Sequence, residues 1–125
     1  MSATLIIDVY FDLSKSNRIE TEDRIIVPRR TKVMWKFISP LNSEFENRDR
    51  WRFEIEFDKP SPFDWSSIRS SSEDVRTSRQ DKEVVTTVDG GKPDPEQPGD
   101  YKYTIRAVDQ FYGRRYDEDP YLIFL

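Results

Sequence analysis

Apolar residues recur at every second position along much of the chain, which is the spacing of β-strands with one buried face. No stretch keeps the 3.6-residue period of an amphipathic helix. The sequence therefore predicts an all-β protein. Its two clearest strands span residues 5–11, with Leu5, Ile7, Val9 and Phe11 facing inward, and residues 51–57, with Trp51, Phe53, Ile55 and Phe57 facing inward.

Shorter apolar or alternating runs predict the remaining strands. Residues 24–27 and 32–39 are expected to form a hairpin around the Pro-Arg-Arg turn at residues 28–30. Later strands are expected at residues 83–88, 101–108 and 121–125. The last of these is apolar on both faces, which indicates a central position in a sheet or a covered edge.

Two segments have the composition of loops. Residues 66–82 are polar and rich in Ser, with only Ile68 and Val75 to bury, so we expect a mobile connection that could become ordered on a partner. Residues 89–100 combine three Gly and three Pro with acidic residues, which is typical of a reversal that leads into the next strand.

Together these segments predict one domain over residues 1–125 with a Greek-key architecture. The chain length lies in the usual range of a single domain. About seven to eight short strands, most of them antiparallel, fit a β-sandwich of two sheets better than an open sheet. Eight Phe, six Tyr and three Trp supply large rings to fill the space between the sheets.

The composition excludes several kinds of chemistry. The chain contains no Cys and no His, so disulfides, thiolate nucleophiles and imidazole bases or metal ligands are ruled out for it. Carboxylate pairs remain, but a small sandwich offers little concavity in which to place them. We therefore expect no enzymatic activity.

Charge and the N-terminal sequence bear on partners and location. The formal net charge is -4, the pI is about 4.9, and acidic and basic residues are interspersed, which disfavours binding to nucleic acid. The first residues enter an alternating strand without the features of a signal peptide, and no apolar run is long enough to span a bilayer. We expect a cytoplasmic protein that binds neither nucleic acid nor membrane.

The stretch GDYKYTIRAV at residues 99–108 carries a G-x-Y-x-Y motif and precedes a final strand. This arrangement resembles the cupredoxin-like β-sandwich pattern, including small bacterial domains of that type, in which a Cys and a His follow the tyrosines. Here those two positions are Ile105 and Val108. Because a blue-copper site takes two imidazoles and a thiolate, the resemblance implies the fold without metal, cofactor or electron transfer. It is strongest over residues 32–57 and 98–125.

The G-x-Y-x-Y motif also occurs as the tyrosine corner of other Greek-key sandwiches, including immunoglobulin-like ones. Tyr101 and Tyr103 are therefore expected to bury their rings and to direct a hydroxyl to a loop carbonyl. Trp35 and Trp51 are in phase with neighbouring apolar residues and are expected in the core. Trp65, beside the Ser-rich segment, either plugs the end of the sandwich or forms an exposed anchor for a partner.

Acidic residues near the predicted turns leave one metal alternative open. Calcium accepts carboxylate-rich loops, but the EF-hand spacing is absent, and acids beside Pro and Gly are usually solvated turn residues. The residues that could contribute to such a calcium site are Asp117, Glu118 and Asp119, with Asp94, Glu96 and Asp100.

The loop at residues 110–121 is the most suggestive candidate for function, because Tyr and Arg are enriched at binding hot spots. The alternative is an ordinary hairpin that turns at Gly113, with its rings packed on the sandwich and its arginines paired to Asp117 and Asp119. The residues predicted to contact a partner are Trp65, Phe111, Tyr112, Arg114, Arg115 and Tyr116.

The leading hypothesis is a non-catalytic, metal-free protein-binding module that serves as an adaptor or accessory subunit of a larger bacterial assembly. Two alternatives remain. Exposed Trp and Tyr rings could stack on a carbohydrate or another small ligand, although the missing export signal disfavours this. Small size and acidic charge would also suit a phage-encoded or host-defence inhibitor.

Overall fold

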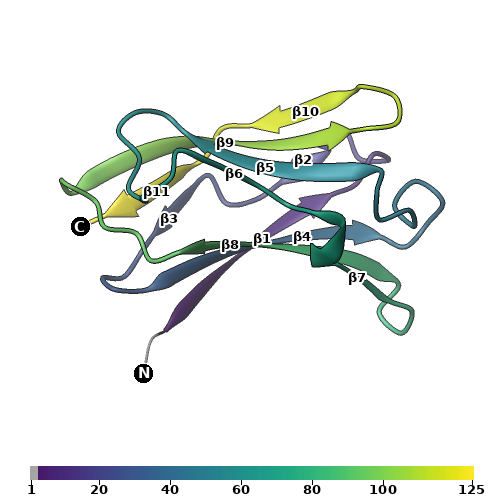
Figure 1. Cartoon of the computed structure of the whole chain (residues 1–125), viewed down its shortest axis with the longest axis horizontal. Helices are drawn as coiled ribbons and strands as arrows, with labels where there is room; N and C mark the ends of the chain where they lie inside the picture. Colours follow the sequence, from purple (N-terminus) through teal and green to yellow (C-terminus); the bar gives the residue numbers. More distant parts are fainter. Residues whose placement is uncertain (1–2) are drawn as a thin grey trace.

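Two β-sheets packed face to face make up the protein, and the predicted all-β sandwich is confirmed (Figure 1). The computed structural model describes residues 3–125. The five-stranded sheet has the order β2 (Ile19–Glu20), β1 (Thr4–Phe11), β4 (Lys32–Pro40), β8 (Glu83–Gly91) and β7 (Val75–Ser78). The six-stranded sheet has the order β3 (Arg24–Ile26), β11 (Tyr121–Phe124), β9 (Gly99–Asp109), β5 (Trp51–Phe57) and β6 (Ser67–Arg69), and β10 (Arg115–Glu118) pairs with β9 beside this path.

Most strand pairs are antiparallel, as predicted, but each sheet also contains a parallel pair, β1 with β4 and β3 with β11. The predicted hairpin of residues 24–27 and 32–39 is wrong, because β3 and β4 belong to different sheets. Alternation identifies a strand and its buried face but not its partner. The structure also has more strands than predicted, since short edge strands such as β2 and β6 carry little pattern.

The Ser-rich segment at residues 66–82 is not the irregular connection that its composition predicted. It forms β6, the 3-10 helix η1 (Ser72–Asp74) and β7, and so supplies an edge strand to each sheet. Val75 is buried, and the backbone N–H of Phe53 donates a hydrogen bond of 2.9 Å to the hydroxyl of buried Ser70. Polarity was misleading because edge strands are held by backbone hydrogen bonds and can keep polar side chains in water.

Aromatic rings fill the space between the sheets. The inward phases predicted for β1 and β5 are confirmed, since Phe11 and Phe53 are buried and their rings meet edge to face. Phe37 of β4 stacks on Phe53 across the sandwich, with 4.3 Å between the ring centroids. β11 lies between β3 and β9, so of the two positions predicted for the last strand, central or covered edge, the central one is correct.

The two tyrosines of the G-x-Y-x-Y motif are core residues, as predicted. The hydroxyl of Tyr101 donates a hydrogen bond to the carbonyl of Gln97 in the preceding loop. Tyr103 is fully buried, and its hydroxyl accepts a hydrogen bond of 3.2 Å from the indole N–H of Trp35 in the opposite sheet. Burial raises the pKa of Tyr103 well above its usual value, so this hydroxyl stays neutral.

Replacing Tyr103 should show how much this bond between the sheets contributes to stability. Tyr103→Phe should lower the free energy of unfolding by about 1–3 kcal/mol, because it leaves the buried Trp35 N–H without an acceptor. Denaturant unfolding followed by Trp fluorescence measures the change. Tyr10→Phe, on a half-exposed ring, is the control and should change stability by less than about 0.5 kcal/mol. Equal effects of the two substitutions would contradict the role assigned to the hydrogen bond.

Candidate functional site

The candidate site is built on Asp109, the last residue of β9. Its carboxylate has no exposed surface, because the residue continues the inward-facing phase of the strand. That phase consists of Tyr101, Tyr103, Ile105 and Ala107 before it reaches Asp109. Residues 109–115, which we call the Asp109 loop, then turn back into β10 at one end of the sandwich (Figure 1). Gly113 has a positive φ of 71°, which a turn of this kind favours.

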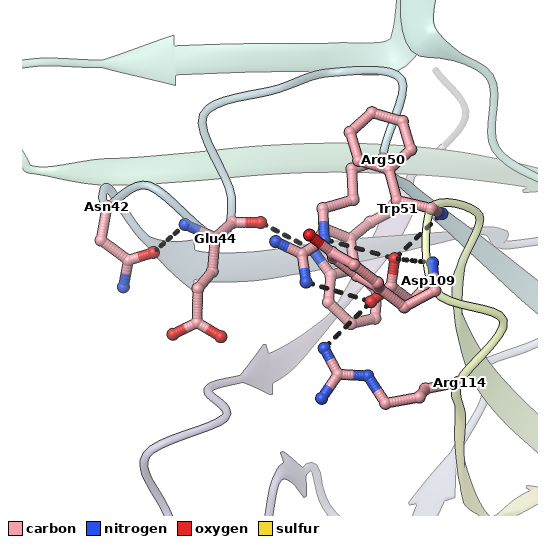
Figure 2. A network of polar contacts seen from close by, with 8 residues as sticks. Asn42, Glu44, Arg50, Trp51, Asp109 and Arg114 are labelled. Atoms are coloured by element: carbon pink, nitrogen blue, oxygen red, sulfur yellow. Dashed lines mark hydrogen bonds and ion pairs between the residues drawn. The ribbon is translucent and has the colours of Figure 1, made fainter.

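Five donors surround the Asp109 carboxylate (Figure 2). Arg50 makes a two-point contact, with Nε 3.2 Å from Oδ1 and a terminal nitrogen 3.0 Å from Oδ2. A terminal nitrogen of Arg114 lies 3.2 Å from Oδ2. The backbone N–H groups of Phe111 and Tyr112 donate to Oδ1 at 3.1 and 3.3 Å. Both carboxylate oxygens are therefore occupied, and two guanidinium groups balance the buried charge.

The pKa of Asp109 shows which of these influences dominates. Burial raises this pKa, but the hydrogen bonds from the two guanidinium groups and the two backbone N–H groups outweigh burial and hold it below its usual value. The hydrogen bond to Asp109 in turn raises the pKa of Arg50. An ionised carboxylate whose oxygens are all occupied is poorly suited to proton transfer. The arrangement can hold a loop in place, and it does not resemble an acid–base site.

Arg50 also connects the Asp109 loop to the segment between β4 and β5 (Figure 2). Its carbonyl accepts a hydrogen bond of 2.8 Å from the N–H of Gln110. The side-chain amide of Gln110 donates to the carbonyl of Asp49 at 2.9 Å. Next to Arg50, the indole N–H of Trp51 donates to the carbonyl of Glu44 at 2.8 Å. The two segments thus form one hydrogen-bonded end of the sandwich.

Two aromatic rings project from this fixed loop into solvent. Tyr112 is 71% exposed and Phe111 is 53% exposed, which is a large exposure for aromatic side chains. The guanidinium carbons of Arg50 and Arg114 lie 5.0 and 5.5 Å from the centroid of the Tyr112 ring, within the range of cation–π contacts. The arginines that neutralise Asp109 therefore also contact the most exposed ring of the loop.

Two further predicted contact residues are Arg115, the last residue of the Asp109 loop, and Tyr116, which follows it. Arg115 is exposed at the start of β10. Tyr116 is half-buried, and its ring packs against those of Phe11 and Trp51, with centroid distances of 5.8 and 6.2 Å. The guanidinium carbon of Arg18 lies 5.1 Å from the centroid of the same ring. Tyr116 therefore packs mainly against the core next to the loop and adds little to the exposed surface.

Trp65 lies at the opposite end of the sandwich. Its ring stacks on that of Phe63 with 4.6 Å between centroids, and its indole N–H donates a hydrogen bond of 2.9 Å to the carbonyl of Gly90. These contacts fit a plug over the core better than an exposed anchor. The length of β5 separates Trp65 from the Asp109 loop, since Trp51 pairs with Asp109 whereas Phe57 contacts Trp65. The structure therefore does not bring Trp65 and residues 110–121 into one surface.

The acidic residues after the Asp109 loop bond to the neighbouring strand β9. Asp117 accepts a hydrogen bond of 3.2 Å from Arg106, and Asp119 accepts one of 2.8 Å from the hydroxyl of Thr104. The hairpin alternative predicts that the arginines of the loop pair with Asp117 and Asp119. Instead, Asp117 pairs with Arg106, and Arg114 pairs with Asp109. Within residues 3–125, no group of three or more acidic side chains is placed so that it could hold a metal ion.

The positions that correspond to metal ligands in the cupredoxin-like pattern do not converge. Ile105 is fully buried on the inner face of β9, whereas Val108 is only partly buried on the outer face. Because side chains alternate along a continuous strand, two residues three positions apart point to opposite faces of the sheet. Any ligands at these two positions would need a different local backbone to share one metal.

Sequence reasoning missed Asp109 and Arg50, which build the site. A signal for Asp109 exists: an acid stands in the inward phase of an alternating strand, where a charge requires a paired group. Arg114, five residues later, is one such partner. Arg50 is 59 positions away in the chain, and no local pattern relates it to Asp109.

Asp109→Asn should lower the free energy of unfolding by about 3 kcal/mol, because it leaves the largely buried guanidinium of Arg50 without its counter-charge. Urea unfolding at neutral pH measures the loss. Asp117→Asn, which weakens a half-exposed ion pair to Arg106, is the matched control and should lower stability by less than about 1 kcal/mol. A loss for Asp109→Asn no larger than that of the control would contradict the assigned role.

The pH dependence of this contribution has a defined sign. The pKa of Asp109 is lower in the folded than in the unfolded state, so its contribution is complete above the ordinary value of 3.8 and is lost as pH falls through the folded-state pKa. The stability difference between the wild type and Asp109→Asn should therefore stay constant near neutral pH and shrink below about pH 4. Urea unfolding of both proteins across this range is the measurement, and a difference that does not decrease at all below about pH 4 would be inconsistent with it.

Comparison with known proteins does not assign the chain to a family. No protein-family model matches the chain, and no curated protein sequence matches it significantly. Among residues 3–125, none of the helical segments has the length and hydrophobicity needed to span a bilayer. The function is therefore inferred from the chemistry of the site itself.

Proposed function

We propose that this protein is a non-catalytic, metal-free module that binds another protein through the Asp109 loop. In this proposal it acts in the bacterial cytoplasm, as an adaptor or accessory subunit of a larger assembly. The observation that supports it most directly is the exposure of Tyr112 on a loop that the buried carboxylate of Asp109 and its ion pair with Arg50 hold in place.

Preorganisation of the loop is the first part of the argument. Ordering a flexible backbone costs about 1–2 kcal/mol per residue, and a binding loop that is ordered beforehand avoids this cost when it meets its partner. Here the backbone N–H groups of Phe111 and Tyr112 are already fixed by the carboxylate. The ring of Tyr112 is exposed and contributes nothing to the core, so the ordered loop does not serve to bury it. A partner that binds this ring would not have to order the loop.

The kind of surface favours a protein as partner. Tyr and Arg are enriched at protein-binding hot spots, because they offer flat apolar area together with hydrogen-bond donors. Phe111, Tyr112, Arg114 and Arg115 present this combination on one turn. The carbohydrate alternative expected exposed Trp and Tyr rings, and it has less support because one of these rings, Trp65, is stacked on Phe63.

We also propose that the sandwich is of the cupredoxin-like type, without a metal site. In support, the G-x-Y-x-Y motif lies on β9 in the interior of one sheet, and the final strand β11 pairs directly with it. The apolar residues at the two ligand positions, Ile105 and Val108, agree with a version of the fold that carries no metal. This assignment concerns architecture alone, since a fold does not specify an activity.

Substitution of Tyr112 tests the proposed contact. Tagged wild-type protein should retain a specific partner from extracts of the source organism, and Tyr112→Ala should raise the Kd for that purified partner about 30-fold, the effect of a hot-spot side chain worth about 2 kcal/mol. Isothermal titration calorimetry with the purified partner gives both Kd values.

Leu125→Ala is the matched control for this measurement. It removes a large apolar side chain that is even more exposed than Tyr112 but lies near the start of β9, at the opposite end of the sandwich. The control should bind the partner as the wild type does. If the Tyr112→Ala protein bound with the wild-type Kd, the Asp109 loop would not be the contact surface.

A further inference from the structure

A second surface lies along the outer edge of β1. On one side, β1 pairs with β4 from Thr4 to Tyr10. On the other side, β2 pairs only with Tyr10 and Phe11. Within the part of the chain that the structure describes, residues 4–7 therefore form an open strand edge, and Figure 1 shows β1 (purple) beginning at the margin of the molecule.

Alternation along the strand shows which backbone groups face this edge. The carbonyl of Ala3 accepts a hydrogen bond from the N–H of Lys32 at the start of β4, so the odd-numbered residues direct their backbone groups toward β4. The even-numbered residues face outward, in agreement with the carbonyl of Asp8, which accepts a hydrogen bond of 3.0 Å from the hydroxyl of Thr21. The N–H and C=O groups of Ile6 consequently face the open edge.

A groove of about 760 Å³ follows this edge, between β1 of one sheet and the start of β3 in the other. Its apolar lining includes Ile6 and Tyr10, which are 54% and 50% exposed, together with Leu5 and Ile25. Natural sandwiches usually protect such edges with charge, proline or a covering segment, because an apolar edge readily pairs with another strand.

The charged residues that line the groove have one sign. The charged residues that line it are Asp8, Glu20 and Glu22, all acidic. Arg24 follows on β3, but its guanidinium is paired with Asp100. The edge therefore combines outward backbone groups, apolar side chains and a negative field, and a ligand that complements all three is extended, apolar at alternate positions and basic.

We propose that the β1 edge binds an extended basic segment of a partner protein by strand addition. The incoming strand pairs with the outward backbone groups of Thr4 and Ile6 and lays its apolar side chains on the inner face of the sheet, toward Leu5 and Ile25. Its Lys or Arg side chains then lie on the outer face of the sheet, the face from which Asp8 projects. This surface is separate from the Asp109 loop, and the inference does not depend on the function proposed for that loop.

A second copy of this chain fits the edge less well. In a pairing of two β1 edges, the incoming strand would be β1 of the second copy, which carries Asp8 and no basic side chain that could complement Asp8, Glu20 and Glu22. Like charges across an interface are destabilising, and a basic strand removes this repulsion. The charge of the groove thus favours a different chain as occupant.

Two synthetic peptides provide the probe. One alternates Val and Lys over about seven residues, enough to span the open edge, and the other alternates Val and Glu. In fluorescence anisotropy titrations with the whole chain, the Lys peptide should bind at least about tenfold more tightly than the Glu peptide. In ¹⁵N spectra, the Lys peptide should shift the amide signals of Thr4, Ile6 and Asp8. Shifts confined to the other edge strands, β6 and β7, would overturn the proposal.

Ile6→Pro tests strand addition itself. Proline removes an outward N–H that β4 does not use, and edge strands tolerate such a substitution, so circular dichroism and the Tm should show a folded protein. The Lys peptide should bind this variant at least about tenfold more weakly, whereas Ile6→Val, which keeps the N–H, should bind it as the wild type does. A folded Ile6→Pro protein with the wild-type Kd for the peptide would overturn the proposal.

Two further measurements complete the test. The double variant Glu20→Lys/Glu22→Lys changes only exposed side chains and should weaken binding of the Lys peptide even if Ile6→Pro does not fold. Tyr112→Ala should leave peptide binding unchanged, which separates this surface from the Asp109 loop. If sedimentation showed a wild-type dimer that Ile6→Pro converts to a monomer, a second copy would occupy the edge, contrary to the proposal.

Discussion

A carboxylate with no exposed surface is stable in its charged form only where donors and positive charge replace water, and Asp109 imposes this requirement on one end of the molecule. Arg50 must reach it from the neighbouring connection, Arg114 must turn back toward it, and the backbone after Asp109 must direct two N–H groups inward. The conformation of the loop follows from these demands. With its N–H bonded to the carboxylate and its ring beside two guanidinium groups, Tyr112 is left facing solvent.

The two ends of the sandwich are closed by different physical means. At the Asp109 end, charge and directional hydrogen bonds join the loops. At the other end, Trp65 and Phe63 cover the core by stacking, with the Trp35 to Tyr103 hydrogen bond beneath them. An apolar plug buries the surface it uses, whereas an ionic cluster can hold a loop rigid while leaving neighbouring rings exposed. This difference explains why the candidate contact surface lies at the charged end.

The sequence predicted strands and their buried faces well. A strand with one buried face has apolar residues at every second position, and this pattern can be read from the strand's own residues. It predicted Tyr101, Tyr103 and Trp35 as core residues for the same reason. The hairpin error and the Ser-rich segment have a different origin, since strand pairing and edge position depend on the whole sheet. The link between Arg50 and Asp109 spans 59 positions, so only the folded chain reveals it. Exposure of Tyr112 on a Gly-containing turn, in contrast, was accessible from local composition.

The position of β11 has a consequence for how the chain acquires its structure during translation. Among the described strands, β11 is the only partner of β3 in the six-stranded sheet, so residues 24–26 cannot be paired until residues 121–123 have left the ribosome. The five-stranded sheet lies entirely within residues 4–91 and can assemble earlier. For most of synthesis β3 therefore has no native strand beside it, and a nascent chain in this state is open to mispairing with its neighbours.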